Sequence, residues 1–264
     1  MNAEPEAGAR SIEMEVTIDA PVEAVWEALS TGEGMARWFA PTARVNPGEG
    51  GSVFVSWGGG VEGEGRIEVW EPNRRIAWSE PLGSDQPIRF LVDFVLEARE
   101  GGTTKLRMVH SGFGEGSDWD EQYEATKAGW TYFLFNLGWY LVRHRGKIRR
   151  MISSRRRTER PVAEVWQSLL GRFGIDVSQS ERRNGYTMRL GGDQHGHVEY
   201  VREPRNFAGT ITSLDDGLLF IELETGAPSW HCGVWISVYG IEEQRALGLQ
   251  AALDEVMEAE FGGG

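Results

Sequence analysis

One helical motif occurs twice in the chain, and this repetition limits the folds that the chain can adopt. Residues 21–29 contain Pro-Val-x-x-Val-Trp-x-x-Leu, and residues 161–169 contain the same pattern. Apolar residues at positions i, i+3, i+4 and i+7 line one face of a helix. Proline suits the first helical turn, where its missing N–H would have had no partner. The repetition predicts two related helices, each burying one apolar face.

Two further pairs of segments occur in the same order in both halves. The first half has residues 65–68 followed by 71–74, and the second has 196–199 followed by 203–206. Two helices that begin at proline could share a few letters by chance, but three matches in one order favour a duplication. With 264 residues, the chain has room for two domains of ordinary size.

The first half combines strand patterns with one long helix. Residues 11–18 alternate apolar and polar side chains, as a half-buried strand does. Further strand patterns, separated by turns, occur at residues 52–57, 63–70, 76–78, 89–97 and 105–111. Successive hairpins predict an antiparallel sheet. From Asp118 to about Arg145 the apolar period becomes helical. We therefore expect an α+β fold with one long helix after the sheet.

Several motifs of the first half come in a recognisable order. They are residues 18–26, 35–41, 50–54 and 65–67, with the later Pro72. Together they resemble the START-like (SRPBCC) superfamily, and more narrowly the family named after the C-terminal domain of the activator of the heat-shock chaperone ATPase. The resemblance covers residues 11–145 and is faint in the second half. It implies a helix-grip fold, in which a curved antiparallel sheet grips the long helix around an apolar cavity.

This resemblance and the repeat divide the chain into four parts. We expect a flexible tail (residues 1–10), a START-like domain (11–145), a basic linker (146–160) and a degenerate START-like domain (161–264). The residues before Pro161 are rich in arginine and do not alternate clearly. The second domain is therefore expected to lack its first strand or to bury it poorly.

The basic residues gather in one segment of an acidic chain. Residues 143–160 hold nine Lys or Arg and one Glu, whereas the net charge of the chain is −13. These bases could bind an anionic partner, or they could stabilise a helix C-terminus and dock on an acidic face. We favour the structural interpretation. Nucleic acid is not an expected partner, because an acidic body does not attract it broadly.

The cysteine content and the hydropathy indicate a compartment. Cys232 is the single cysteine, which excludes an intrachain disulfide and fits a reducing environment. No apolar run approaches the roughly 18 residues of a membrane span, and the first ten residues do not resemble a signal peptide. We expect a cytoplasmic protein without a membrane span.

Aromatic residues are the strongest functional signal. If the sheet curves away from the helix, they line a pocket for a flat or hydrophobic ligand; otherwise they fill a core. The expected ligand-binding residues are Trp38, Phe39, Trp57, Trp78, Phe90, Phe94, Met108, His110, Tyr123, Trp130 and Phe133.

Few ionisable residues fall among these aromatics. His110 shares a strand face with Leu106 and Met108, and could act as a general base, orient a ligand or lie in the core. Glu64 and Arg66 share another strand face and could supply polar groups to the pocket.

The histidines of the second half do not form a metal-binding pattern. His195 and His197 alternate like strand neighbours, and His231 precedes Cys232, but these spacings match no zinc motif. We assign no catalytic residue, metal or cofactor.

Three functions follow from these observations. The leading one is binding of a hydrophobic small molecule in the first domain, without obligatory catalysis. The resemblance implies a second, a co-chaperone or stress-response interaction protein with a chaperone as partner. The third is an enzyme of the cyclase or hydrolase type that uses His110. We lean towards a protein that is not an enzyme.

Overall fold

The chain forms two compact units, Met1–Gly146 and Lys147–Gly264, in the computed structural model. The structure describes residues 10–58, 60–81, 89–177, 184–224 and 229–262. Residues 1–9 of the predicted flexible tail lie outside the described residues. Arg10, which the prediction included in that tail, is the first residue of a strand.

The first unit is a seven-stranded antiparallel sheet with order β1-β7-β6-β5-β4-β3-β2. Its strands are β1 (Arg10–Ile18), β2 (Thr42–Asn46), β3 (Ser52–Gly58), β4 (Val61–Glu71), β5 (Arg75–Pro81), β6 (Arg89–Ala98) and β7 (Thr104–Phe113). The helices are α1 (Val22–Ser30), α2 (Gly32–Ala36) and α3 (Asp120–Trp139). One-turn segments occur at Glu100–Gly102, Ser117–Trp119 and Tyr140–His144. The expected antiparallel sheet followed by one long helix is confirmed.

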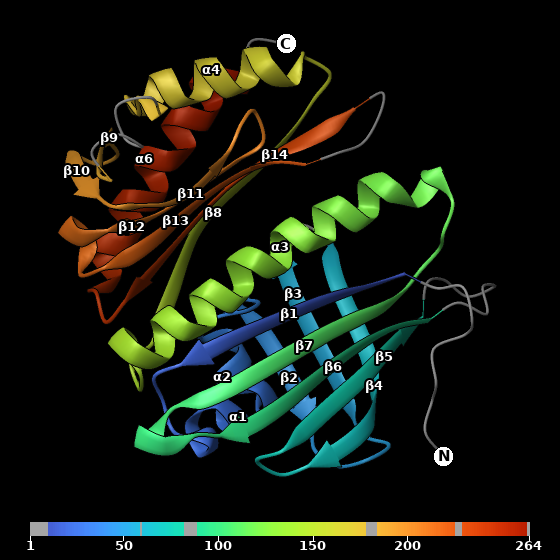
Figure 1. Ribbon diagram of the computed structural model, residues 1–264. Helices are drawn as coiled ribbons and strands as arrows, with labels where there is room; N and C mark the ends of the chain where they lie inside the picture. The colour runs from blue at the N-terminus through green and yellow to red at the C-terminus, as the bar shows by residue number, and fades with distance from the viewer. Residues whose placement is uncertain (1–9, 59, 82–88, 178–183, 225–228, 263–264) are drawn as a thin grey trace. The chain divides into compact units, whose positions relative to one another are not determined.

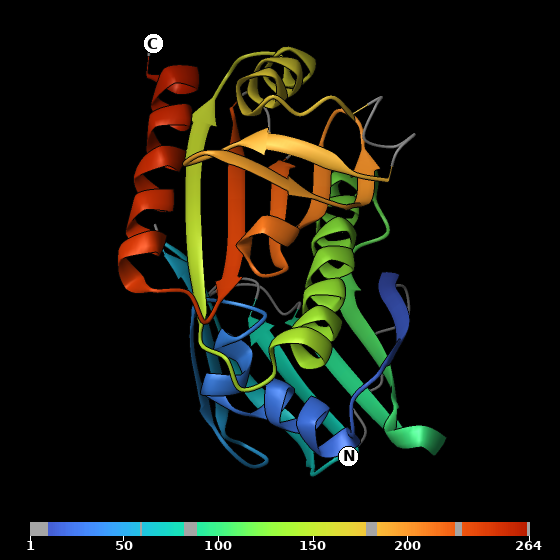
Figure 2. The ribbon, with the colours of Figure 1, turned by 90° about the vertical axis from the view of Figure 1, so that its left-hand side faces the viewer.

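The helix α3 crosses one face of this sheet (Figure 1), which we call the inner face. Figure 2 shows the same arrangement from a second side. Strand alternation assigns side chains to the two faces: Phe94 and Leu96 of β6 are buried on the inner face, while Asp93 lies on the outer face and binds Arg75. The sheet therefore grips α3 through the apolar residues of its strands.

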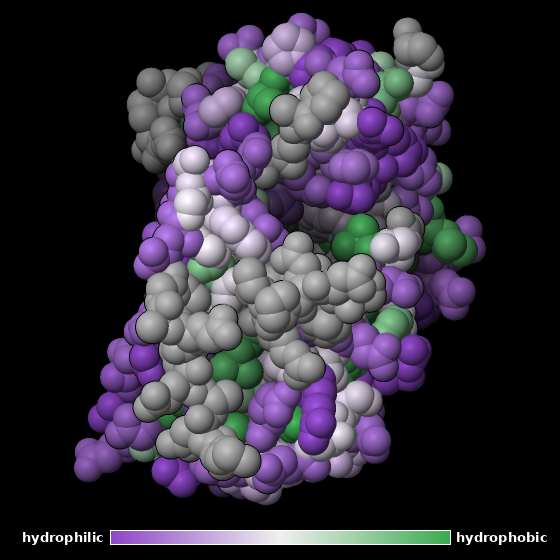
Figure 3. Space-filling view, turned by 90° about the vertical axis from the view of Figure 1, so that its right-hand side faces the viewer, coloured by the Kyte–Doolittle hydropathy of each residue, from purple (hydrophilic) through white to green (hydrophobic). Residues whose placement is uncertain are grey.

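Hydrophobic residues are scattered on the visible surface of the first unit. Figure 3 shows them as small green groups separated by polar purple residues. Among the described residues of this unit, the large hydrophobic side chains that are exposed are Val61 and Val142. Most of its aromatic rings are therefore enclosed rather than displayed.

The second unit repeats the order of five of the seven strands of the first, and β9 and β10 pair in a separate two-stranded sheet. Its five-stranded sheet has the order β11-β12-β13-β14-β8, which matches β4-β5-β6-β7-β1 when each unit is numbered from its own first strand. The elements are β8 (Arg149–Thr158), α4 (Val162–Phe173), β9 (Tyr186–Arg189), β10 (Asp193–Gly196), β11 (Val198–Arg202), β12 (Asn206–Ile211), a turn of helix at Thr212–Leu214, β13 (Gly217–Leu223), β14 (Trp230–Tyr239) and α6 (Glu243–Phe261). The predicted tandem α+β fold is confirmed.

The predicted basic linker of residues 146–160 is wrong over most of its length. Arg149–Thr158 form the strand β8, which pairs with β14 along ten positions. Ile152 is buried, and Arg155 binds Glu224 through two hydrogen bonds, at 2.7 and 2.5 Å. These arginines are strand residues, and Glu224 meets the charge of Arg155, so the second unit has its own first strand.

The strand β8 lies at the edge of its sheet, and a side chain of α6 binds the backbone of β8 on the edge that does not pair with β14. The amide of Gln250 accepts a hydrogen bond from Ser153 N and donates one to Ser153 O, both at 3.1 Å. Gln250 thus occupies the backbone groups that a further strand would use. Edge strands with free backbone groups are prone to pair with other chains.

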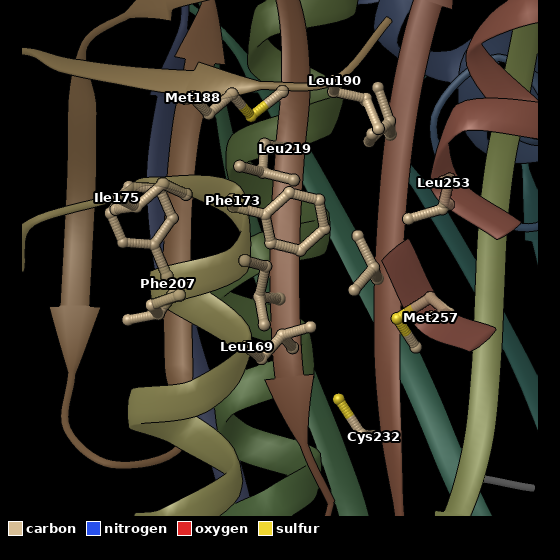
Figure 4. Close-up of a cluster of buried hydrophobic side chains, with 14 of the residues drawn as sticks. Leu169, Phe173, Ile175, Met188, Leu190, Phe207, Leu219, Cys232, Leu253 and Met257 are labelled. Atoms are coloured by element: carbon tan, nitrogen blue, oxygen red, sulfur yellow. The ribbon is translucent and has the colours of Figure 1, made fainter. Parts of the chain in front are cut away.

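The core of the second unit is filled by α4, α6 and the segment that leads into β9. Figure 4 shows Phe173 of α4 among Leu219 and Phe207 of the sheet, with Leu253 of α6 nearby. Cys232 is buried within the same cluster. This unit therefore uses its helices to pack a hydrophobic core.

A buried carboxylate joins the two helices of the second unit. The side chain of Glu260, near the end of α6, is 1% exposed. Its Oε1 accepts a hydrogen bond from Arg160 at 2.7 Å, and its Oε2 accepts one from Ser168 at 2.7 Å and another from Arg172. Burial acts to raise the pKa of Glu260, but these hydrogen bonds lower it overall.

Within the described residues, no helix is both long and apolar enough to cross a membrane.

Candidate functional site

The inner face of the first unit carries a continuous set of rings, which we call the aromatic cluster. Its members are Phe39, Trp57, Phe90, Phe94, His110, Phe113, Tyr123, Trp130 and Phe133. They come from the segment after α2, from β3, β6 and β7, and from α3. Neighbouring ring centroids lie 4.7–6.0 Å apart, the range of favourable aromatic contact.

Trp130 is at the centre of the aromatic cluster. Its ring stacks on Phe39 with centroids 5.5 Å apart and an interplanar angle of 10°. It meets Phe94 and His110 edge to face, at 5.7 and 6.0 Å. Trp130 therefore joins the helix to the sheet and to the segment after α2.

The segment after α2 is fixed by hydrogen bonds before it reaches the cluster. The indole of Trp38 donates to Ala28 O of α1 at 2.9 Å, and the side chain of Asn136 in α3 donates to Trp38 O. Trp38 also stacks on Phe39 at 5.1 Å. These contacts hold Phe39 against α3, so Trp38 fixes the position of Phe39 in the aromatic cluster.

His110 has one ring nitrogen bound and one without a partner. Its Nδ1 accepts a hydrogen bond of 2.8 Å from Trp130 Nε1, so the proton of the neutral ring lies on Nε2. Nε2 is buried and has no hydrogen-bond partner in the structure. Burial lowers the pKa of His110 to about 4. At neutral pH the ring is therefore uncharged and presents one unused N–H donor.

Glu80 is a polar group of the inner face that the sequence analysis missed. It lies two residues after Trp78 on β5 and therefore on the same face; the indole of Trp78 donates to its Oε1 at 3.1 Å. Register pairs Glu80 with Phe90 of the cluster. Burial raises the pKa of Glu80, although the hydrogen bond from Trp78 acts to lower it.

Two glycines of β4 make room for Glu80. A Cβ atom at Gly65 would lie 2.8 Å from Trp78 Cδ1 and 2.9 Å from Ser79 O, so only glycine fits there. A Cβ atom at Gly63 would lie 3.4 Å from Glu80 Oε2. The carboxyl group thus rests over the part of β4 that lacks side chains.

The prediction that Glu64 and Arg66 point into the pocket is wrong. Both side chains are exposed, whereas Gly63 and Gly65 occupy the inner face between them. Since successive strand residues face opposite sides, the glycines turn the charged residues outward. The alternation Trp78-x-Glu80 is the sequence signal that could have identified the polar residue of this face.

The predicted ligand-binding residues fall into two layers. Eight of them belong to the aromatic cluster: Phe39, Trp57, Phe90, Phe94, His110, Tyr123, Trp130 and Phe133. Trp38, Trp78 and Met108 are buried beneath or beside it. Phe113, which the sequence analysis did not include, joins His110 to Tyr123 at 4.9 and 5.4 Å.

Among the described residues, no group of three or more His, Cys, Asp or Glu is placed to hold a metal ion. His195 and His197 are exposed.

Comparison with known proteins gives one family match, which lies within the first unit. Residues 19–141 match the family described as Activator of Hsp90 ATPase homolog 1-like protein. No curated protein matches the sequence.

Several solved structures are similar to half of the chain or to most of it. Protein MLL2253 from Mesorhizobium loti is 29% identical, with a TM-score of 0.45, covering 51% of this chain and 98% of its own. The Aha1 dimer from Colwellia psychrerythraea is 22% identical, with a TM-score of 0.46, covering 52% and 99%. DynU16, from the dynemicin biosynthetic locus, is 18% identical, with a TM-score of 0.43, covering 96% of both chains.

Proposed function

We propose that the first unit, a START-like domain of the Activator of Hsp90 ATPase homolog 1-like family, binds a flat hydrophobic small molecule against the aromatic cluster. The observation that carries this proposal is the unpaired Nε2–H of His110. A buried polar group without a partner costs about 1–3 kcal/mol. A ligand oxygen that accepts this hydrogen bond would remove that cost.

The surroundings of His110 suit such a ligand. Trp57, Phe90 and Phe133 of the cluster are only partly buried, so their rings retain surface for contact. A Cβ atom added at Gly129 of α3 would lie 3.8 Å from Phe133 Cε2. Apart from the two residues next to Gly129 in the chain, no other described side chain would lie within 4 Å of it. Apolar walls with a few placed polar groups are typical of small-molecule sites.

The state of His110 favours binding over general-base catalysis. A base with a pKa of about 4 has little affinity for protons at neutral pH. Its Nδ1 is also occupied by Trp130. We therefore assign His110 the role of a neutral hydrogen-bond donor, which orients a ligand without requiring a reaction.

Calorimetric titration with 2-acetylnaphthalene, an uncharged flat ketone, tests the proposal. We expect the wild-type protein to bind it and His110→Phe to bind it several-fold to about tenfold more weakly, the effect of one hydrogen bond. Gly129→Leu should block binding by filling the space beside Phe133. His195→Phe, at an exposed histidine of the second unit, is the matched control. Absence of binding to the wild-type protein, or affinities unchanged in both variants, would overturn the proposal.

A second candidate function comes from the family description. It makes the first unit a co-chaperone that acts on the ATPase of a heat-shock chaperone through its surface. Addition of the protein to the chaperone should then raise the rate of ATP hydrolysis, and His110→Phe should leave this stimulation unchanged. A rate that does not respond to the protein would count against this function. A cytoplasmic location, expected from the single cysteine, fits both candidates.

A further inference from the structure

The proposed function leaves the chemical class of the ligand open, and Glu80 bears on it. Glu80 lies on the inner face of β5, beside Phe90 of β6, and Phe90 in turn contacts His110 at 5.0 Å. The strands of Glu80 and His110 are separated by one strand, about 10 Å at the backbone. A fused-ring molecule lying on Phe90 would therefore reach towards both polar groups.

The carboxyl group of Glu80 does not serve to balance the positive charge of a lysine or arginine on its face of the sheet. It accepts a hydrogen bond from the indole N–H of Trp78, an uncharged donor. The inner-face positions of β3 to β7 that the structure describes carry no lysine or arginine. Arg10, on the edge strand β1, lies 4.8 Å from the centre of the Tyr123 ring and pairs with Asp120 at 2.6 Å, so its charge is already met by a carboxylate. At the described inner-face positions of β3 to β7, no basic side chain would therefore compensate the charge of an anionic ligand.

We propose that Glu80 is a second polar residue of the site and that, with His110, it selects uncharged flat ligands carrying oxygen acceptors over their carboxylate analogues. This inference rests on the proposed function. A ligand carboxylate would lose its hydration without gaining a cation and would face Glu80 on the same surface. A ketone or hydroxyl oxygen meets neither obstacle and can accept the hydrogen bond of His110 Nε2.

The test compares 2-acetylnaphthalene with 2-naphthoate, which has the same ring and replaces the acetyl group by a carboxylate. We expect the wild-type protein to bind the ketone at least about tenfold more tightly than the acid at neutral pH. Glu80→Gln keeps the size of the side chain and its ability to hydrogen-bond but removes its charge. It should bind the ketone about as well as the wild type and bind 2-naphthoate about tenfold better.

Glu64→Gln, at an exposed carboxylate of the neighbouring strand, is the control and should leave both affinities unchanged. Glu80→Met, of similar length and without charge, gives a second comparison, and thermal unfolding checks that each variant is folded. If the ketone binds but its preference over 2-naphthoate is the same in wild type, Glu80→Gln and Glu80→Met, the inference is wrong and the proposed function stands. If the ketone does not bind the wild-type protein, the proposed function fails, and the inference fails with it.

Discussion

Trp130 Nε1 donates a hydrogen bond of 2.8 Å to His110 Nδ1 and thereby decides which nitrogen of the imidazole is free. This bond can form only with the neutral ring, because a protonated Nδ1 has no lone pair to offer. It also sets the free N–H on the opposite side of the ring. The helix α3 therefore determines the tautomer of His110 and the group available to a ligand.

Trp130→Phe should raise the pKa of His110. Burial lowers this pKa to about 4, and the hydrogen bond from the indole further favours the neutral ring. Removing a bond of about 1 kcal/mol from the neutral form should raise the pKa by about one unit. An NMR titration of the imidazole protons measures it. Trp26→Phe, whose ring packs against Trp70 instead, is the control, and an unchanged pKa in Trp130→Phe would contradict the assignment of the bond.

Stability between pH 7 and pH 5 should depend on His110. Because its pKa is near 6.5 when unfolded and about 4 when folded, the unfolded chain binds more protons in this range, and acidification favours unfolding. The expected contribution is a loss of about 2 kcal/mol.

The raised pKa of Glu80 acts in the opposite direction, since its contribution to stability falls as pH rises above its unfolded pKa. The comparison must therefore be between wild type and His110→Gln, by urea unfolding at both pH values. His110→Gln should lose less stability on acidification than the wild type does. Equal losses in the two proteins would mean that His110 is not buried as a neutral ring.

Glu260→Ala should destabilise the second unit at neutral pH. The substitution leaves Arg160, Arg172 and Ser168 without their shared acceptor. Breaking a buried pair costs several kcal/mol, but both arginines are about 40% exposed, so we expect a loss on the order of 2 kcal/mol. Glu255→Ala, on the exposed side of the same helix, is the control, and denaturant unfolding is the measurement.

The effect of Glu260→Ala should also disappear in acid. The folded pKa of Glu260 is lowered, so its contribution is present above the ordinary carboxyl pKa and is lost as pH falls through the folded value. Equal differences between the variants at pH 7 and well below pH 4 would show that the lost contacts are not ionic.

Gln250→Ala should promote self-association. Without the amide, both backbone groups of Ser153 on β8 become available to another chain. We expect a loss of stability of about 1–2 kcal/mol and a concentration-dependent increase in mass by analytical ultracentrifugation. Gln250→Glu keeps one acceptor for Ser153 N and should give an intermediate result. A monomeric Gln250→Ala protein at all concentrations would argue against protection of this edge.

The local pattern of the sequence predicts the fold wherever alternation is strong. The apolar residues Phe90, Val92, Phe94 and Leu96 of β6 predict their common face, and the Pro-Val-x-x-Val-Trp motif predicts both α1 and α4. The alternation of apolar and polar residues does not reveal β8, because arginine has both an apolar stem and a charged end. The charged end of Arg155 binds Glu224, which is far away in the sequence. Such a strand is specified by its partner β14 rather than by its own pattern.

The sequence predicted the rings of the candidate site and His110, but neither Glu80 nor the hydrogen bonding of His110. Large aromatics at regular strand and helix positions indicate an interior face without any knowledge of their neighbours. The position of Glu80 over Gly63 depends on the register of β4 against β5, which the local pattern does not contain. The free Nε2 of His110 depends on a bond to a residue 20 positions away.

The strand β8 also decides where the chain can be divided into independent fragments. A fragment that begins at Pro161 lacks β8 and exposes the edge of β14, whose residues include Val234, Ile236 and Val238. Such an apolar edge invites aggregation. A division between Gly146 and Lys147 keeps both sheets whole. Each unit therefore carries its own edge strand, and separate expression of the two halves should respect that boundary.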